Sequence, residues 1–142
     1  MNKSKVVLDM AVLLAAMSVF AGTAYDLTVE LESNPVGLDV ERPRFSWKLK
    51  PETGKKAQMQ TAYRLVLKEA KSLGRTVFDS GKAESDACVL VDPLKTDLKP
   101  RTDYVWSVQL WDETGTAGEF AEPARFDTGY FSQEEWTKDG AM

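Results

Sequence analysis

The chemistry open to this sequence is limited first by a missing residue type: its 142 residues include no histidine. Histidine is the usual general base at neutral pH, so its absence excludes Ser-His-Asp and Cys-His catalytic arrangements and every metal site that needs an imidazole. No glycine-rich phosphate loop follows a strand-like run, and no aspartate-rich calcium loop is present. We therefore expect no catalytic residue, no cofactor-binding residue and no metal ligand in this chain.

Paired carboxylates remain as catalytic candidates, because glycosidases need only two carboxyl groups at a set separation. Three pairs are close in sequence: Glu84 with Asp86, Asp92 with Asp97, and Glu134 with Glu135. Each pair falls in a polar turn or in the C-terminal tail, whereas a catalytic acid needs a pocket that raises its pKa. We interpret all three pairs as solvated surface groups.

The tryptophans are the other candidates for a functional role. Trp47 and Trp106 fall on the inward phase of their strands, which favours core packing. Trp111 is out of phase with Trp106, so we expect it to be half-exposed, where it either covers a neighbouring loop or domain or, with Tyr130, stacks on a sugar ring. Trp136 lies in the tail, where docking onto a following domain is the natural role.

The single cysteine, Cys88, excludes an internal disulfide. It lies in the apolar run 87–91, which favours a buried small hydrophobic side chain over a reactive thiol.

The N-terminus resembles a secretory signal peptide in its order of residue types. Lys3 and Lys5 precede a mostly apolar run, 6–20, and small residues follow at Ala21, Gly22 and Ala24. The run is short and is interrupted by an aspartate, so a transmembrane anchor is disfavoured. We expect residues 1–24 to be removed and the mature protein to be exported, to the periplasm or outside the cell.

Charge argues against nucleic acid as a partner. The chain has 18 basic and 22 acidic residues, a net charge of −4, and loss of residues 1–24 leaves 16 and 21, a net charge of −5. Phosphate-backbone binding needs clustered lysine and arginine, and no basic stripe with interleaved aromatics is visible.

The mature chain reads as one small all-β domain. Seven extended runs separated by turn residues lie at 27–31, 45–49, 63–67, 76–80, 88–91, 104–111 and 124–128. Seven short strands at this spacing predict an immunoglobulin-like or fibronectin-type-III-like β-sandwich over residues 25–129. The tail, 130–142, has no strand pattern and is interpreted as a connector to a further domain.

Two local motifs support the sandwich. Leu98, Pro100 and Tyr104 have the spacing of a tyrosine corner, in which the tyrosine hydroxyl bonds to backbone a few residues upstream. Asp112 to Gly115 predicts a hairpin connection, because aspartate bonds to backbone ahead of it and glycine supplies a left-handed residue.

Five segments together resemble the N-terminal fibronectin-type-III-like, immunoglobulin-like domain of bacterial α-L-rhamnosidases. They are Asn34-Pro-Val-Gly-Leu-Asp-Val-Glu-Arg-Pro-Arg-Phe-Ser-Trp47, Gln60-Thr-Ala-Tyr-Arg64, Phe78-Asp-Ser-Gly-Lys-Ala-Glu-Ser85, Tyr104-Val-Trp-Ser-Val-Gln-Leu-Trp-Asp112 and Phe126-Asp-Thr-Gly129. The resemblance implies a noncatalytic accessory domain from an exported glycoside hydrolase, truncated before the catalytic domain. That family's catalytic acid and base lie in a helical barrel far downstream, so none of them has a counterpart here.

Three functions follow as hypotheses. The first is a domain that packs against the downstream domains of an α-L-rhamnosidase and hydrolyses nothing by itself. The second is a carbohydrate-binding module for rhamnose-containing glycans, and the third is a free-standing exported interaction module. None of them calls for a cofactor.

Overall fold

The computed structural model describes residues 22–50, 58–72 and 74–138. Six strands and one short helix are present in these segments: β1 (Thr23–Val29), β2 (Phe45–Lys50), β3 (Ala62–Glu69), β4 (Thr76–Asp79), β5 (Asp103–Trp111), β6 (Ala124–Asp127) and α2 (Gln133–Lys138). The fold is all-β, as predicted. The predicted signal peptide lies outside the described residues except for its last three positions.

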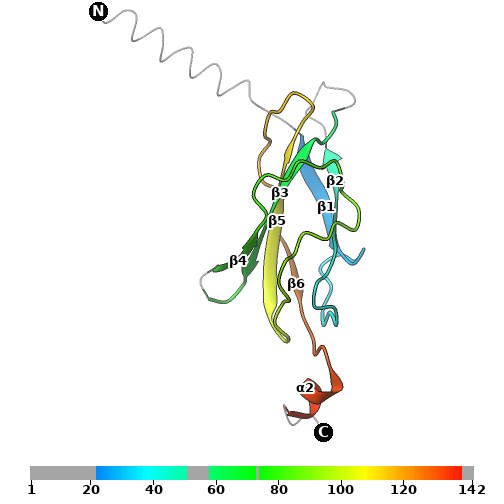
Figure 1. Cartoon of the computed structure of the whole chain (residues 1–142), viewed down its shortest axis with the longest axis vertical. Helices are drawn as coiled ribbons and strands as arrows, with labels where there is room; N and C mark the ends of the chain where they lie inside the picture. Colours follow the sequence, from blue (N-terminus) through cyan, green and yellow to red (C-terminus); the bar gives the residue numbers. More distant parts are fainter. Residues whose placement is uncertain (1–21, 51–57, 73, 139–142) are drawn as a thin grey trace, which may run out of the picture.

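The strands form two antiparallel sheets that face each other (Figure 1). One sheet pairs β1 with β2, and the other has the order β4-β3-β5-β6. The long pairing of β3 with β5 keeps one register from Ala62 opposite Trp111 to Glu69 opposite Tyr104. Since one face of each strand is buried, this register determines which side chains enter the core and which face outward.

Strict alternation along β5 builds the centre of the core. Tyr104, Trp106, Val108 and Leu110 are each at most 1% exposed, whereas the intervening residues are only partly buried. The Trp106 ring meets Phe45 of β2 edge-on, with 4.8 Å between ring centroids, so the two sheets interlock through aromatic side chains. Trp47, at 2% exposure, packs inward as the alternation predicted.

The predicted strand at 88–91 is not a strand, so the expectation of seven strands is wrong for the described chain. The segment does run beside β2: Phe45 and Val91 exchange both backbone hydrogen bonds at 2.8 Å, and Trp47 N–H donates to the Cys88 carbonyl at 2.9 Å. Between these contacts Leu90 adopts a φ of +50° and donates its N–H to the Ser46 hydroxyl. A left-handed residue turns the chain out of the extended conformation, which breaks the ladder.

The first strand begins and ends earlier than the alternation at 27–31 predicts. Leu27, Val29 and Leu31 alternate as in a strand, but β1 ends at Val29. Glu30 and Leu31 have φ values of +50° and +66°, and the Val29 and Glu32 backbones bond to each other across this turn. Leu31 is consequently 61% exposed rather than buried.

The tyrosine corner is confirmed. The Tyr104 hydroxyl accepts a hydrogen bond from Lys99 N–H at 3.0 Å, and burial raises the pKa of this hydroxyl. The predicted turn after β5 is also confirmed: one Asp112 carboxylate oxygen accepts from the N–H groups of Thr114 and Thr116, and Gly115 has a φ of +82°. Both motifs are local, so their spacing alone identifies them.

Replacing Tyr104 by Phe removes the corner hydrogen bond and keeps the ring. We expect a loss of about 1 kcal/mol in the free energy of unfolding, because Lys99 N–H loses its acceptor. Urea unfolding followed by fluorescence measures this. Tyr25→Phe is the matched control, since Tyr25 is 48% exposed, and should change stability by less than about 0.5 kcal/mol. Equal stability of wild type and Tyr104→Phe would contradict a stabilising corner.

Candidate functional site

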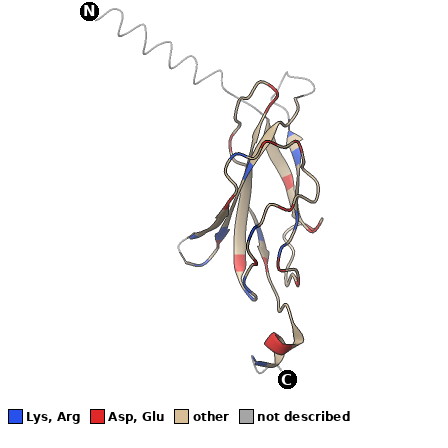
Figure 2. Ribbon diagram, viewed as in Figure 1, with Lys and Arg blue, Asp and Glu red and all other residues tan. Residues whose placement is uncertain are grey.

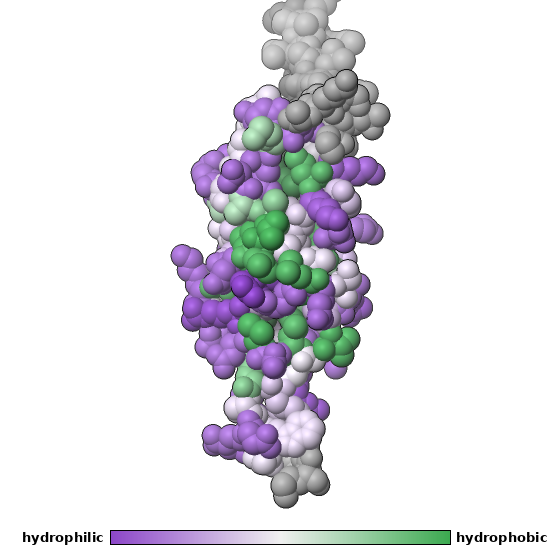
Figure 3. Space-filling view, turned by 90° about the vertical axis from the view of Figure 1, so that its right-hand side faces the viewer, coloured by the Kyte–Doolittle hydropathy of each residue, from purple (hydrophilic) through white to green (hydrophobic). Residues whose placement is uncertain are grey.

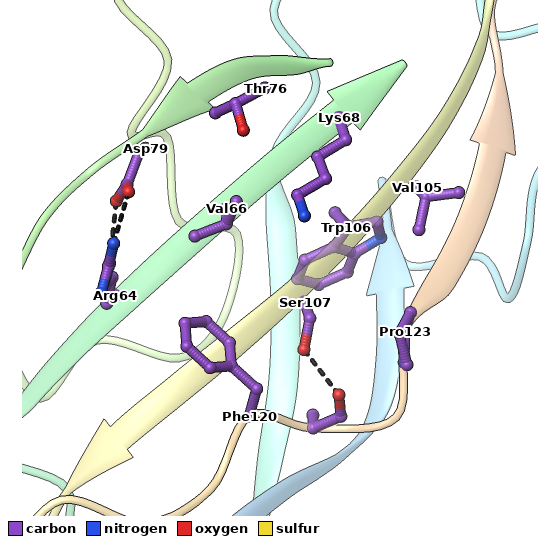
Figure 4. Close-up of a pocket in the computed structure, with 11 residues that line it drawn as sticks. Arg64, Val66, Lys68, Thr76, Asp79, Val105, Trp106, Ser107, Phe120 and Pro123 are labelled. Atoms are coloured by element: carbon purple, nitrogen blue, oxygen red, sulfur yellow. Dashed lines mark hydrogen bonds and ion pairs between the residues drawn. The ribbon is translucent and has the colours of Figure 1, made fainter. Parts of the chain in front are cut away.

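A pocket of about 420 Å³ lies on the outer face of the four-stranded sheet (Figure 4). The residues that line it come from β3, β4, β5 and the segment before β6: Arg64, Val66, Lys68, Thr76, Asp79, Val105, Trp106, Ser107, Phe120, Ala121 and Pro123. The same period-two alternation that buries one face of β3 and β5 places Val66, Lys68, Val105 and Ser107 on the other.

The segment before β6 forms one wall of this pocket and is held by β5. Ser107 donates its hydroxyl to the Ala121 carbonyl at 2.6 Å, and Ala121 N–H donates to the Val108 carbonyl at 3.0 Å. The Gln109 side chain bonds to the Gly118 carbonyl at 3.0 Å. These contacts fix Phe120 and Pro123 opposite β3, so the pocket is largely preformed.

An ion pair lies at one side of the pocket. Arg64 donates from Nε and Nη2 to the two oxygens of Asp79, at 3.0 and 2.6 Å, and its guanidinium lies 5.8 Å from the centre of the Phe120 ring. The Arg64 hydrogen bond, with a further one from Gly81 N–H, lowers the pKa of Asp79 to about 2. Asp79 is therefore ionised, and its charge is balanced by Arg64.

One charged pocket group has no ionic partner within the described part of the chain. Lys68 makes no ion pair there, whereas Arg64 on the same strand pairs with Asp79. The indole N–H of Trp106 also lacks an acceptor in the described chain, but this ring packs on the core side of β5 and its N–H is buried from solvent. Figure 4 shows the Lys68 side chain extending from β3 towards the Trp106 and Ser107 side of the pocket.

A second candidate surface lies at the end of the molecule where the described chain finishes, and we call it the C-terminal pole: Val36, Arg101, Tyr130, Phe131 and Trp136. The Tyr130 ring contacts Trp136 edge-on at 5.1 Å between centroids and has the Arg101 guanidinium 5.4 Å from its centre. Trp136 is 43% exposed and Val36 is 83% exposed. Figure 1 shows α2 standing beyond the end of β6, apart from the two sheets.

Helix α2 was missed by the sequence reasoning, which found only a connector there. Its signal is a capping box: Ser132 accepts from Glu135 N–H at 3.2 Å, and the Glu135 carboxylate accepts from Phe131 N–H at 2.7 Å. The spacing Ser-x-x-Glu is visible in the sequence. None of the residues of α2 is buried, so capping and the Tyr130–Trp136 contact hold it in place.

The carboxylate pairs predicted to be solvated are mostly so. Glu84, Asp97 and Glu134 form exposed ion pairs with Lys82, Arg42 and Lys138, and Asp86 and Asp92 are exposed. Glu135 is the exception, because it caps α2 and is half-buried. The described residues contain no cluster of three or more potential metal-ligating side chains.

The remaining candidates are half-buried. Cys88 packs against the core, in keeping with a hydrophobic rather than a reactive role. Trp111 is half-exposed as predicted, with the Lys82 ammonium 5.3 Å from its ring centre.

The surface of the described residues mixes charged and apolar side chains. Charges of both signs are mixed over the visible face in Figure 2. The face towards β1 and β2 carries several apolar groups separated by polar ones (Figure 3). Within the described ranges, no helix is long and apolar enough to cross a membrane.

Comparison with known proteins identifies the fold's relatives. The profile of the Rha78A-like, N-terminal immunoglobulin domain matches residues 24–132. The chain belongs to this family. It is 39% identical over 112 residues to an α-L-rhamnosidase of Streptomyces avermitilis and 34% identical over 109 residues to one of Formosa agariphila, matches that cover 78% and 74% of this chain.

Solved structures agree with this assignment. The Streptomyces avermitilis α-L-rhamnosidase, determined with L-rhamnose, matches with a TM-score of 0.74 at 35% identity, over 82% of this chain and 11% of that one. The enzyme from Dictyoglumus thermophilum matches with a TM-score of 0.74 at 30% identity, over 84% of this chain and 14% of that one. The chain spans about 11% of the length of the curated relatives it matches, and it does not match their catalytic region.

The Arg64–Asp79 pair predicts how the stability of this Rha78A-like domain changes at low pH. A folded-state pKa of about 2, against an ordinary 3.8, means that ionised Asp79 stabilises the fold above pH 3.8 and loses this contribution as the pH falls towards 2. Asp79→Asn should therefore be slightly less stable at pH 7, with the difference small because the pair is partly exposed.

The difference in the free energy of unfolding between wild type and Asp79→Asn should decrease towards zero as the pH falls from 4 to 2, as measured by urea unfolding at each pH. Asp86→Asn is the control, because Asp86 is exposed and forms no ion pair in the described chain. A difference that stays constant down to pH 2 would show that Asp79 does not act through its charge.

Proposed function

We propose that this chain is the noncatalytic accessory β-sandwich domain of an exported α-L-rhamnosidase-type glycoside hydrolase, and that it packs against the domain that follows it. One observation carries the proposal: the family match spans nearly all of the described residues but only about a ninth of the relatives' length. The domain is described as N-terminal in its family, so in the relatives the rest of the enzyme follows it.

The C-terminal pole is the surface we assign to this packing. The family match ends at residue 132, and α2 begins at Gln133, so the helix lies just past the shared domain. A six-residue helix with no buried residue gains little from its own hydrogen bonds and needs tertiary contacts for stability. The exposed Trp136 ring and Val36 supply an apolar surface beside it.

Val36 belongs to this surface through backbone contacts. Leu38 N–H donates to the Asp127 carbonyl, and Gly129 N–H donates to the Leu38 carbonyl. The loop that carries Val36 is thereby held beside the residues that lead to Tyr130.

Export rests on the leader-like order of residues in 1–24. Cleavage near Ala24 would remove Thr23 and Ala24 from the start of β1. In the described structure these two residues pair with Lys50 and Leu49 of β2. N-terminal sequencing of protein recovered from the periplasm or medium locates the processing site. Recovery of the unprocessed chain in the cytoplasm alone would contradict export.

We expect the purified chain to release no nitrophenol from 4-nitrophenyl α-L-rhamnoside above a buffer control. The physical reason is that the described residues offer exposed or already paired carboxylates and the sequence offers no histidine. Turnover that is retained through purification and lost on heating would contradict the noncatalytic assignment.

A chimera tests the packing role. The chain replaces the matched domain of the Streptomyces avermitilis enzyme, and thermal unfolding and rhamnoside hydrolysis are measured with and without Trp136→Ala. We expect the substitution to lower the unfolding temperature of the chimera by a few degrees and to leave that of the isolated chain nearly unchanged, because α2 is exposed there.

Exposed Met59 gives the control, since Met59→Ala lies beside Glu113, at the end of β5 away from the pole, and should not affect the chimera selectively. Equal effects of Trp136→Ala on chimera and isolated chain would contradict packing at the pole.

Sugar stacking at Trp111 and Tyr130 has less support as a second function. Each ring already has a cation over it, Lys82 on Trp111 and Arg101 on Tyr130, and Tyr130 also contacts Trp136. A sugar would have to use whatever ring surface these contacts leave.

A further inference from the structure

The pocket on the outer sheet face is not used by the proposed function. It is lined by β3, β4, β5 and the segment before β6, whereas the C-terminal pole is formed by the residues after β6 and the loop that carries Val36. Its volume of about 420 Å³ falls in the range of about 300–1,000 Å³ that is typical of small-molecule sites.

The walls of the pocket combine apolar surface with a few polar groups. Val66, Val105, Phe120 and Pro123 contribute carbon surface, and Phe120 is 41% exposed. The Asp79 carboxylate, the Ser107 hydroxyl and the Thr76 hydroxyl are hydrogen-bonding groups on the same lining. A pyranose ring has C–H faces and hydroxyls in the same combination, whereas a purely apolar ligand would cover these polar groups without bonding to them.

The pocket also carries a net positive charge in an acidic chain. Arg64 and Asp79 balance each other, which leaves the Lys68 ammonium without an ionic partner in the described chain. This charge favours a negative group on the ligand.

We propose that this pocket binds a saccharide that carries a carboxylate, a uronic acid residue. The carboxylate pairs with Lys68, ring hydroxyls bond to Asp79 and Ser107, and an apolar ring face lies against Phe120. This site is independent of the accessory role, because a free-standing domain could use it equally well.

A protein partner fits this pocket less well than a sugar. Protein interfaces bury large, nearly flat areas, whereas this feature is a concave pocket with one exposed aromatic at its edge. The large exposed apolar side chains Leu31, Val36 and Trp136 do not line it.

The test is a titration of the isotope-labelled chain followed by backbone amide NMR signals. Three probes separate the contributions: D-glucuronate carries both the ring and the charge, D-glucose has only the ring, and acetate has only the charge. We expect saturable shifts at millimolar D-glucuronate for the Val66, Val105 and Ser107 amides. D-Glucose should bind more weakly and acetate should not saturate.

Two variants assign the contacts. Lys68→Gln should weaken D-glucuronate binding about fivefold, the effect of one exposed ionic contact, and leave D-glucose binding unchanged. Lys95→Gln is the matched control, since Lys95 is exposed and does not line the pocket. Phe120→Ala should weaken both sugars, and its amide spectrum away from the pocket verifies that it folds.

Several results would overturn the proposal. Equal binding of acetate and D-glucuronate would reduce the site to a nonspecific anion contact. An equal loss of D-glucuronate affinity in Lys68→Gln and Lys95→Gln would show that the sugar binds elsewhere. The absence of any saturable shift with D-glucuronate would exclude the site for this ligand class. None of these results bears on packing at the C-terminal pole, which the chimera tests separately.

Discussion

The structure depends on the alternation of side chains along β5. Tyr104, Trp106, Val108 and Leu110 enter the space between the sheets, and their burial supplies much of the hydrophobic stabilisation, about 1.5–3 kcal/mol for each large side chain as an upper estimate. Because a strand alternates strictly, the same residues that make this core force Val105 and Ser107 onto the outer face. The outer pocket is thus a geometric consequence of the core, completed by the segment that returns to β6.

The tyrosine corner fixes the end of the domain at which the chain leaves the sandwich. Tyr104 accepts from Lys99 N–H, while Thr128 donates its hydroxyl to the Lys99 carbonyl at 2.6 Å and accepts from Thr102 N–H at 3.0 Å. The Tyr104 bond ties the loop before β5 to that strand, and the two Thr128 bonds connect the same loop to the residues after β6. They therefore set the direction in which the chain leaves the sandwich, and with it the position of Tyr130 and α2.

Such an arrangement suits an accessory domain better than an enzyme. Many of its polar groups hold turns, edges and the exit of the chain, and charge pairs such as Arg42 with Asp97 and Arg64 with Asp79 are exposed or partly exposed. The family relationship agrees, since the matched part of the α-L-rhamnosidases is a small immunoglobulin-like domain and not their catalytic region. The features with which this fold could contribute to function are therefore two surfaces, the C-terminal pole and the pocket on the outer sheet face.

The sequence by itself determined those features whose signals are local. Period-two alternation predicted β2, β3 and β5 and the inward tryptophans, and fixed spacings predicted the tyrosine corner and the Asp112 turn. The capping box of α2 was equally local and could have been found from Ser132 and Glu135. By contrast, only the tertiary structure decided that Leu90 breaks the strand at 88–91, because its N–H bonds to Ser46, 44 positions away. The tertiary structure likewise decided the pocket, because side chains from β3, β4, β5 and the loop before β6 meet only after the sheet has formed. Strand pairing joins residues that are distant in sequence, so it has no short-range signature in the sequence.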